Sequence, residues 1–261
     1  MRIIFVLYFA FSSCFLFGQE KPAKKPEFVI IINNEIVTKD KVDEYGEQGY
    51  IKSMNKGVTE EERAKLATKY GDKIGEKEFI VEISLFTESE RLENQKKASS
   101  DNVANENSKI DDGFILKIGD SAKEFTVQMI DGQNIKLSGL KGNVVLLNFW
   151  ATWCAPCLME FYDIPEKILA PYKNDKLVFL PISIGEKKKI VMQKMQRLKK
   201  DNIAFNVGFD PNKKIWNQYA TKAIPKSFLI DQNGIIRFVS TGYTEGSLDK
   251  LATEIKSLFD K

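Results

Sequence analysis

Histidine is absent from this chain of 261 residues. Its absence excludes the Ser-His-Asp and Cys-His nucleophilic arrangements and removes the commonest metal ligand of proteins. A basic block is also missing, because 39 Lys and Arg are interspersed with 36 Asp and Glu for a net charge of +3. This distribution argues against nucleic acid as a partner. The 43% of hydrophobic residues suffices for one full-sized domain and a smaller module.

Long apolar runs are scarce, and the run at the N-terminus is too short to span a bilayer comfortably. Residues 1–18 have the pattern of an export signal: Arg2 gives the charge, residues 3–17 are apolar, and Gly18 is small. The alternative is a buried first element of the fold. A lipid anchor at Cys14 is a less favoured variant, because the apolar run continues past it. We therefore expect a periplasmic or cell-envelope protein.

Cysteine is rare as well, and once the signal is removed only Cys154 and Cys157 remain. Two cysteines three residues apart serve zinc binding, covalent haem attachment or reversible disulfide chemistry. A zinc site would need two further Cys or His ligands, which the mature chain lacks. Haem attachment requires a histidine directly after the second cysteine, where Leu158 stands. The pair therefore predicts a redox-active dithiol with no metal and no cofactor.

The residues around the pair favour this interpretation. Residues 144–147 form a continuous apolar run typical of a strand buried on both faces. A helical pattern follows from Ala155, so Cys154 is expected at a helix N-terminus, where unpaired amides and the helix dipole stabilise a thiolate. Pro156 suits a first helical turn, and Cys157 would be shielded one turn further on. A purely structural disulfide is the alternative, although it would close a very small loop.

A family resemblance extends over residues 113–261. The segment Leu-Asn-Phe-Trp-Ala-Thr-Trp-Cys-Ala-Pro-Cys at 147–157 resembles the exported thioredoxin-fold proteins of the TlpA/ResA type, which are thiol-disulfide oxidoreductases. Residues 119–125 resemble the entry segment of that family, and residues 223–231 resemble its second hallmark. The resemblance implies an α/β thioredoxin fold, with a mixed central sheet flanked by helices and a βα insertion.

The same resemblance implies a site for a substrate strand. The peptide bond between Ile224 and Pro225 would be cis and would face the cysteine pair, at a cost of only about 0.5 to 1 kcal/mol. In isolation, an ordinary trans proline would be the default. Trp153 and Pro156, which flank Cys154, are expected to contact the substrate together with Ile224 and Pro225.

Glu160 matches an acidic residue that tunes thiol reactivity in this family. Its alternative role is that of a solvated carboxylate on the helix surface. Cytosolic thioredoxins place a buried Asp six residues before the first cysteine, and Asn148 stands there in this chain. An amide cannot titrate, so Glu160 or water is the candidate proton acceptor. This departure fits the exported branch and puts a role like that of cytosolic thioredoxin in doubt.

Residues 27–86 are expected to form a small α+β module. A capping box at residues 59–62 predicts a helix to Tyr70, and alternating apolar residues at 79–85 predict a half-buried strand. The pattern resembles the short plug-type modules of TonB-linked outer-membrane receptors, which suggests docking or spacing; a generic α+β fold is the alternative. Residues 87–112, rich in Glu, Lys, Asn and Ser, are expected to be a flexible linker.

The thioredoxin-like domain is expected to span residues 113–261. Strands are expected at 125–129, 135–137, 144–147, 177–184, 205–209, 227–230 and 235–239, and helices at 155–172, 187–200, 212–219 and 248–259. The lysines of residues 187–200 could form a patch for an acidic partner, but a solvated helix face is favoured.

The sequence thus predicts an exported protein disulfide oxidoreductase that contributes to redox homeostasis in the envelope. Cys154, ionised and reachable, would exchange with a partner disulfide, and Cys157 would resolve the mixed disulfide. The resemblance favours reduction, which requires a reductant protein, expected in the membrane.

Two other functions stay open. A peroxiredoxin-like peroxidase shares the fold but requires Thr three residues before its reactive cysteine, where Ala151 stands. A non-enzymatic envelope binding protein would use residues 27–86 for docking and carry a dormant thioredoxin domain.

Overall fold

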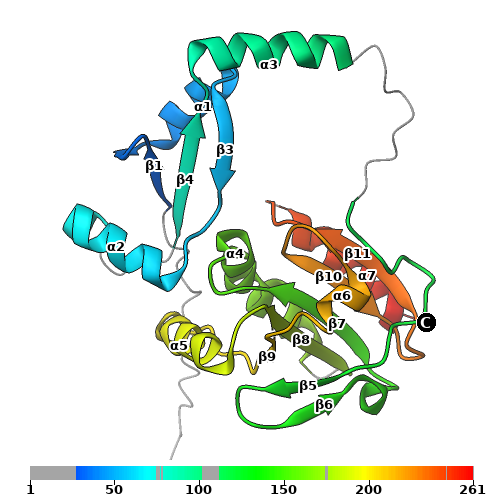
Figure 1. The fold of residues 1–261 in the computed structure, drawn as a ribbon. Coiled ribbons are helices and arrows are strands. Elements are labelled where there is room, and N and C mark those ends of the chain that lie inside the picture. The colour runs from blue at the N-terminus through cyan, green and yellow to red at the C-terminus, as the bar shows by residue number, and fades with distance from the viewer. Residues whose placement is uncertain are drawn as a thin grey trace, which may run out of the picture.

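The computed structural model describes residues 28–74, 77, 79–101, 112–173, 176–244 and 246–260 (Figure 1). The expected export signal at residues 1–18 and the alternative lipid anchor at Cys14 lie outside the described residues. In the part of the chain that is described, every helix is too short or too polar to cross a membrane. The strands form one sheet of four strands and one of seven.

The four-stranded sheet has the order β2-β1-β4-β3. Its strands are β1 (Val29–Ile32), β2 (Glu35–Val37), β3 (Ile51–Asn55) and β4 (Ile80–Leu85). Asn33 and Asn34 connect β1 to β2 with φ angles of 48° and 67°, a left-handed conformation that asparagine adopts more readily than most residues. Apolar side chains from both faces of this sheet are buried in two small cores.

One helix covers each face of the small sheet. Helix α1 (Lys39–Glu47) packs through Val42, and helix α2 (Glu60–Tyr70) packs through Leu66 and Ala67. Thr59 and Glu62 form the expected capping box at the start of α2, in which each side chain accepts the backbone N–H of the other residue. A 3-10 turn, η1 (Gly71–Lys73), follows α2. We refer to this sheet with α1 and α2, residues 28–86, as the N-terminal module.

Helix α3 (Glu88–Asp101) occupies much of the segment expected to be a flexible linker. That expectation does not hold for these residues. The Thr87 N–H donates to the carboxylate of Glu90, and the Glu90 N–H donates back to the Thr87 hydroxyl, which caps the helix. Glu88 forms an ion pair with Arg91. Local polar contacts therefore support a helix that has no apolar stripe to reveal it in the sequence.

The seven-stranded sheet is mixed and has the order β11-β10-β7-β8-β9-β5-β6. Its strands are β5 (Thr126–Met129), β6 (Asn134–Lys136), β7 (Val144–Trp150), β8 (Leu177–Ile184), β9 (Gly208–Asp210), β10 (Lys226–Ile230) and β11 (Ile236–Thr241). The helices of this domain are η2 (Leu137–Leu140), α4 (Ala155–Ile164), η3 (Pro165–Leu169), η4 (Ala170–Tyr172), α5 (Lys188–Leu198), η5 (Lys199–Asp201), α6 (Trp216–Tyr219) and α7 (Ser247–Phe259).

Strand β7 lies inside the sheet, between β10 and β8, and all of its residues are buried. Its side chains alternate between two large cores: Val144 and Leu146 enter one, while Val145 and Leu147 enter the other. Helices α4, α5 and α7 cover the first face, and α6 covers the second. This arrangement is the mixed sheet flanked by helices that the sequence predicts, with β8 and α5 as the βα insertion.

Two expected helices differ in detail. The helix expected at residues 155–172 changes after α4 to a π turn and a 3-10 turn, because Pro165 and Pro171 lack the N–H that an α-helix requires. The helix expected at residues 212–219 is reduced to α6. The carboxylate of Asp210 accepts the backbone N–H groups of residues 214–216, at the point where α6 begins.

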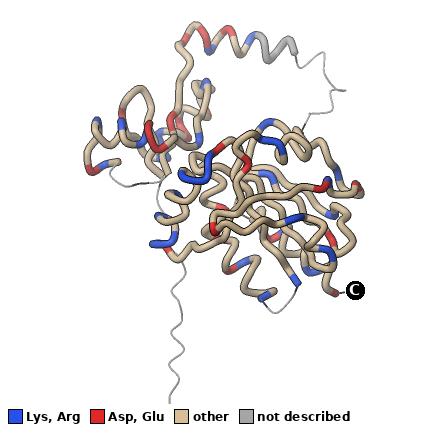
Figure 2. The backbone as a smooth tube through the Cα atoms, turned by 60° about the horizontal axis from the view of Figure 1, so that its bottom comes forward, with Lys and Arg blue, Asp and Glu red and all other residues tan. Residues whose placement is uncertain are grey.

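Charged residues of both signs are spread along the described backbone (Figure 2). The sequence predicts that the lysines of α5 form a solvated face, with a patch for an acidic partner as the alternative. Lys194 differs, because it is only 3% exposed and its ammonium lies 2.9 Å from the carboxylate of Glu60 in the N-terminal module. Lys194 therefore forms an ion pair within the chain and does not belong to a solvated face.

Candidate active site

The cysteine pair lies where β7 ends and α4 begins. Cys154 is the N-cap residue of α4, and Pro156 follows in the first turn. A disulfide joins Cys154 to Cys157, with a Cα–Cα distance of 5.3 Å. The expected position of Cys154 at a helix N-terminus is therefore present in the structure.

The sulfur of Cys154 contacts backbone groups from two elements. The Cys157 N–H donates to it over 3.3 Å, and the carbonyl oxygen of Ile224 lies 3.8 Å away. The bond between Ile224 and Pro225 is cis. The structure thus brings Cys154, Ile224 and Pro225 together. An N–H directed at the sulfur at the positive end of a helix dipole stabilises a thiolate after reduction.

Glu160, on the same helix as Cys157, belongs to a group of buried polar side chains. Its carboxylate accepts a hydrogen bond of 2.9 Å from the side-chain amide of Asn148, and this amide also donates to the Ser227 hydroxyl over 2.9 Å. Burial raises the pKa of Glu160 to about 7, although the hydrogen bond from Asn148 lowers it. Both protonation states are therefore populated near neutral pH. The alternative role of Glu160, a solvated surface carboxylate, is wrong, because the side chain is buried.

Ser227 is a site residue that the sequence analysis missed. It lies two residues after Pro225, and in the pairing of β10 with β7 it stands directly opposite Asn148. The antiparallel register between the cis-proline segment and the strand before Cys154 could have identified it.

Glu186 is a second such residue, and it holds the loop before the cysteines. Its carboxylate accepts the backbone N–H and the hydroxyl of Thr152, and it also accepts the hydroxyl of Ser183. Glu186 follows β8, which runs parallel to β7, so both strands end at the same edge of the sheet. No local sequence pattern marks this contact.

Segment 55–58 of the N-terminal module lies against the cysteine loop. The Ala155 N–H donates to the carbonyl oxygen of Lys56 over 2.9 Å. Cys154 is 3% exposed, whereas the neighbouring Trp153 is 39% exposed. The expectation that Cys154 is reachable is therefore wrong for this arrangement of the chain, while Cys157 is shielded as expected.

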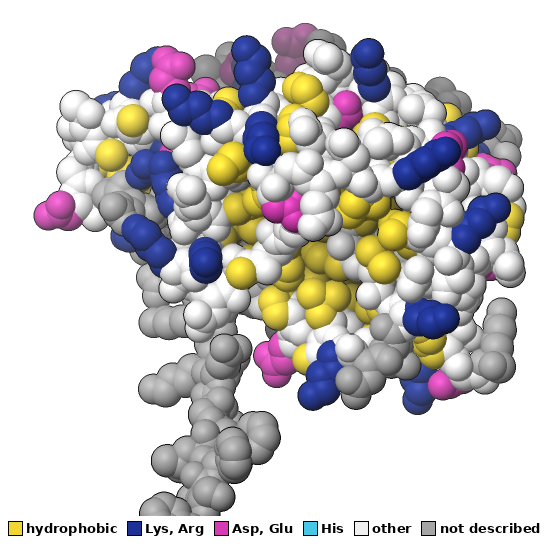
Figure 3. All heavy atoms as spheres, turned by 90° about the horizontal axis from the view of Figure 1, so that it is seen from below, with side chains coloured by type: hydrophobic (Ala, Val, Ile, Leu, Met, Phe, Trp, Pro, Cys, Tyr) yellow, Lys and Arg dark blue, Asp and Glu magenta, His cyan; other side chains and the backbone are white. Residues whose placement is uncertain are grey.

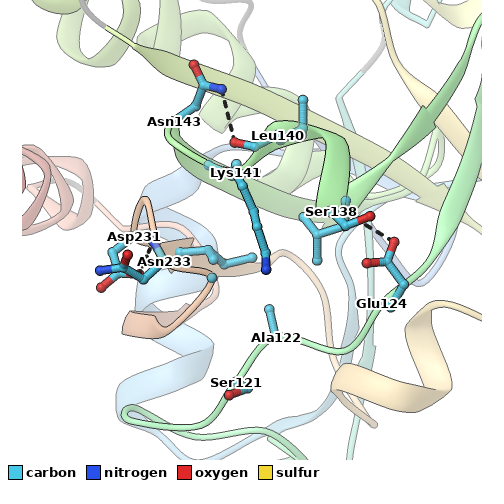
Figure 4. Close-up of a pocket in the computed structure, with 13 residues that line it drawn as sticks. Ser121, Ala122, Glu124, Ser138, Leu140, Lys141, Asn143, Asp231 and Asn233 are labelled. Carbon is cyan, nitrogen blue, oxygen red and sulfur yellow. Dashed lines mark hydrogen bonds between the residues drawn. The ribbon is translucent and has the colours of Figure 1, made fainter.

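One cavity, of about 310 Å³, lies beside the disulfide and is lined by Lys56, Pro156 and Tyr243 among others, and further cavities lie away from it. A pocket of about 260 Å³ lies at the start of β7, where Lys141, Ser138 and Glu124 point toward one space (Figure 4). It is roughly 20 Å along the strand from the cysteine loop. On the face at the bottom of Figure 1, hydrophobic side chains gather in a hollow with Lys and Arg around it (Figure 3). Among the described residues, no cluster of His, Cys, Asp and Glu is suited to hold a metal ion.

Comparison with known proteins supports the same site. A model described as the AhpC/TSA family matches residues 118–239, which include the disulfide and Pro225. The ResA thiol-disulfide oxidoreductase of Geobacillus kaustophilus is 31% identical over 142 residues, which are 54% of this chain and 79% of that protein. The ResA of Bacillus cereus is 34% identical over 141 residues, which are 52% of this chain and 79% of that protein.

Two solved structures are also similar to this chain. A candidate protein disulfide isomerase from Bacteroides thetaiotaomicron has a TM-score of 0.53 and 30% identity, and the match covers 57% of this chain and 94% of that one. A candidate thiol:disulfide interchange protein DsbE from Chlorobium tepidum has a TM-score of 0.50 and 31% identity, and the match covers 55% of this chain and 98% of that one.

These similarities confirm the predicted thioredoxin fold and the predicted enzyme class, a protein disulfide oxidoreductase. Each match covers most of the other protein but little more than half of this chain. Because identity above 30% extends over more than two thirds of these relatives, this chain belongs to the ResA family of thiol-disulfide oxidoreductases.

Proposed function

We propose that this protein reduces disulfides of exported proteins in the bacterial cell envelope, with Cys154 as the attacking and Cys157 as the resolving thiol. The observation that carries the direction of the reaction is the buried Glu160 on the cysteine helix. The export signal expected at residues 1–18 supports the location.

Exchange takes place in two steps. The Cys154 thiolate attacks a client disulfide, so a Cys154–client bond forms, the client S–S bond breaks, and the departing client sulfur takes up a proton from water. Cys157 then loses its proton and attacks the sulfur of Cys154. The intramolecular disulfide forms, the second client sulfur leaves and is protonated, and the client has gained two electrons.

Surrounding groups assist each step. The Cys157 N–H and the N-terminus of α4 stabilise the Cys154 thiolate. Glu160 has a pKa of about 7. Its ionised carboxylate accepts the proton of Cys157 and then releases this proton to water. Exposed Trp153 and half-buried Pro156 and Ile224 flank Cys154 and provide the client contacts.

Glu160 also favours reduction of clients. A disulfide is a stronger oxidant when the thiolate form that its reduction produces is stabilised. An ionised carboxylate buried near the pair opposes the charge of a thiolate and so lowers the reduction potential. The disulfide form is then preferred, and electrons pass to the client. A thiol protein, which we place in the membrane, must return the enzyme to its dithiol form.

Equilibration with glutathione or dithiothreitol buffers tests the direction. We expect a reduction potential below that of the glutathione couple, and a Glu160→Gln variant should shift it to a higher value. A potential near that of DsbA, about −120 mV, would contradict the reductive role. A Cys157→Ser variant, expressed with its signal, should accumulate mixed disulfides with client proteins.

The peroxidase alternative is disfavoured at the site. Ala151 is buried three residues before Cys154, and Thr152, the nearest hydroxyl in the loop, donates to Glu186. Peroxide consumption by the reduced protein should not exceed that of a Cys154→Ser variant. A non-enzymatic binding protein would show no insulin-disulfide reduction above that same variant.

A further inference from the structure

The N-terminal module contacts the cysteine loop through backbone atoms. The Lys56 carbonyl oxygen accepts the Ala155 N–H, and Gly57 lies against the carbonyl of Trp153. A Cβ atom at residue 57 would lie only 1.6 Å from the Trp153 carbonyl oxygen, and the φ angle of Gly57 is 139°. Glycine alone therefore fits this contact. Figure 1 shows the connection from β3 to α2 passing beside α4. The segment therefore lies directly on the residues next to Cys154.

An aromatic contact holds the module in this position. Phe79, which immediately precedes β4, is fully buried and belongs to the large core that also contains α4. Its ring lies edge-on to the ring of Tyr162, with centroids 5.9 Å apart. A buried aromatic pair of this kind stabilises the folded state by more than the burial of its apolar surface alone.

An ion pair between the module and α5 provides a second anchor. The Glu60 carboxylate, at the start of α2, lies 2.9 Å from the ammonium of Lys194 and 2.6 Å from the guanidinium of Arg197. Burial raises the pKa of Glu60, but the two cations outweigh it and lower the pKa to about 2. This carboxylate is therefore ionised at neutral pH and attracts the module to the catalytic domain.

Thiol-disulfide exchange requires access to a sulfur atom, and the disulfide is nearly buried in this arrangement of the chain. An attacking sulfur must reach one sulfur of the disulfide, and the exchange rate depends on that access. Cys157 is fully buried and Cys154 is nearly so. Lys56 and Gly57 contact Ala155 and Trp153, the residues directly after and before Cys154.

We propose that the N-terminal module is a removable cap on the active site of its own chain, and that client and reductant segments displace residues 56–57 to reach Cys154. This proposal rests on the proposed function and adds its regulation. The module then limits exchange to partners that displace it or to conditions that weaken the ion pair of Glu60.

The test compares the full-length protein with two variants that loosen the cap. Glu60→Lys places a further cation beside Lys194, Arg197 and Arg63, and Gly57→Ala introduces a clash with the Trp153 carbonyl. After reduction, the rate of Cys154 alkylation by iodoacetamide is measured by peptide mass spectrometry, and insulin reduction is measured in parallel. We expect both rates to rise about tenfold, as for a cap whose open population increases by that factor.

Glu61→Lys is the matched control. Glu61 carries the same charge in the same helical turn, but its ion pair is with exposed Lys65 inside the module. We expect alkylation and insulin reduction to stay at the level of the unaltered protein. Glu60→Gln, which removes the attraction without adding repulsion, should give an intermediate rate.

The outcomes separate the cap from the enzyme function. Equal Cys154 alkylation rates in the unaltered protein, Glu60→Lys and Gly57→Ala would overturn the cap, even if all three reduce insulin. Insulin reduction no faster than with Cys154→Ser in any variant would overturn the proposed function, while alkylation would still decide on the cap. If circular dichroism shows that Glu60→Lys unfolds the module, Gly57→Ala decides.

Discussion

The side-chain amide of Asn148 donates a hydrogen bond to the carboxylate of Glu160 over 2.9 Å, and both side chains are buried. Asn148 comes from β7 and Glu160 from α4, so the bond links the two elements that position Cys154. Burial raises the pKa of Glu160 to about 7 and this contact opposes the rise, so both bear on the protonation of Glu160.

The first prediction concerns stability. Because burial raises the pKa of Glu160 from 4.5 to about 7, the folded protein holds a proton there that the unfolded chain has released. This contribution is fully present below about pH 4.5 and is lost as pH rises through about 7, on the order of a few kcal/mol. Urea unfolding of the oxidised protein should show this loss. The loss should be absent in Glu160→Gln; an equal pH dependence in both proteins would contradict the raised pKa.

The second prediction concerns the proton acceptor. Asn148→Ala removes the hydrogen bond that favours the ionised carboxylate, so the pKa of Glu160 should rise further. The pH at which insulin reduction is half-maximal should move upward with it. Ser227→Ala, which removes only the other acceptor of the Asn148 amide, serves as the control and should leave this midpoint unchanged.

A third prediction addresses the covalent intermediate. Cys157→Ser should form a stable mixed disulfide with a model peptide that carries a disulfide, since no resolving thiol is left. Cys154→Ser should form little, because the remaining Cys157 is fully buried. Mass spectrometry of the trapped species identifies the bonded cysteine. Trapping through Cys157 instead would reverse the roles assigned to the two thiols.

The fourth prediction tests the support of the cysteine loop. Glu186→Ala leaves the Thr152 N–H, the Thr152 hydroxyl and the Ser183 hydroxyl without their acceptor. Each unpaired buried group costs about 1 to 3 kcal/mol, so we expect a loss of several kcal/mol in urea unfolding. Glu166→Ala, at an exposed position of the same charge, should change stability by less than about 0.5 kcal/mol.

Local pattern was sufficient to predict the core of the site. The apolar run before Cys154 and the helical spacing after it placed the cysteines between β7 and α4, where the structure has them. The resemblance supplied the cis bond before Pro225. The capping box of Thr59 and Glu62 is likewise a short-range signal, and it is present.

Contacts between distant segments could not be predicted in this way. Glu186 meets Thr152, and Glu60 meets Lys194, because separate strands and helices come together in the folded chain. Neither hydrophobic periodicity nor residue spacing contains such information. Helix α3 was missed for a different reason, since its polar residues show no apolar stripe and its support comes from local pairs.

The contact between Gly57 and Trp153 joins main chain to main chain, without a side chain on the glycine. Such a contact carries no information about amino-acid identity, so it would exclude every incoming polypeptide equally. Discrimination among substrates must then come from side chains beside the disulfide, such as Trp153, after the module has moved. Timing and selectivity of electron transfer would thus reside in different parts of one chain.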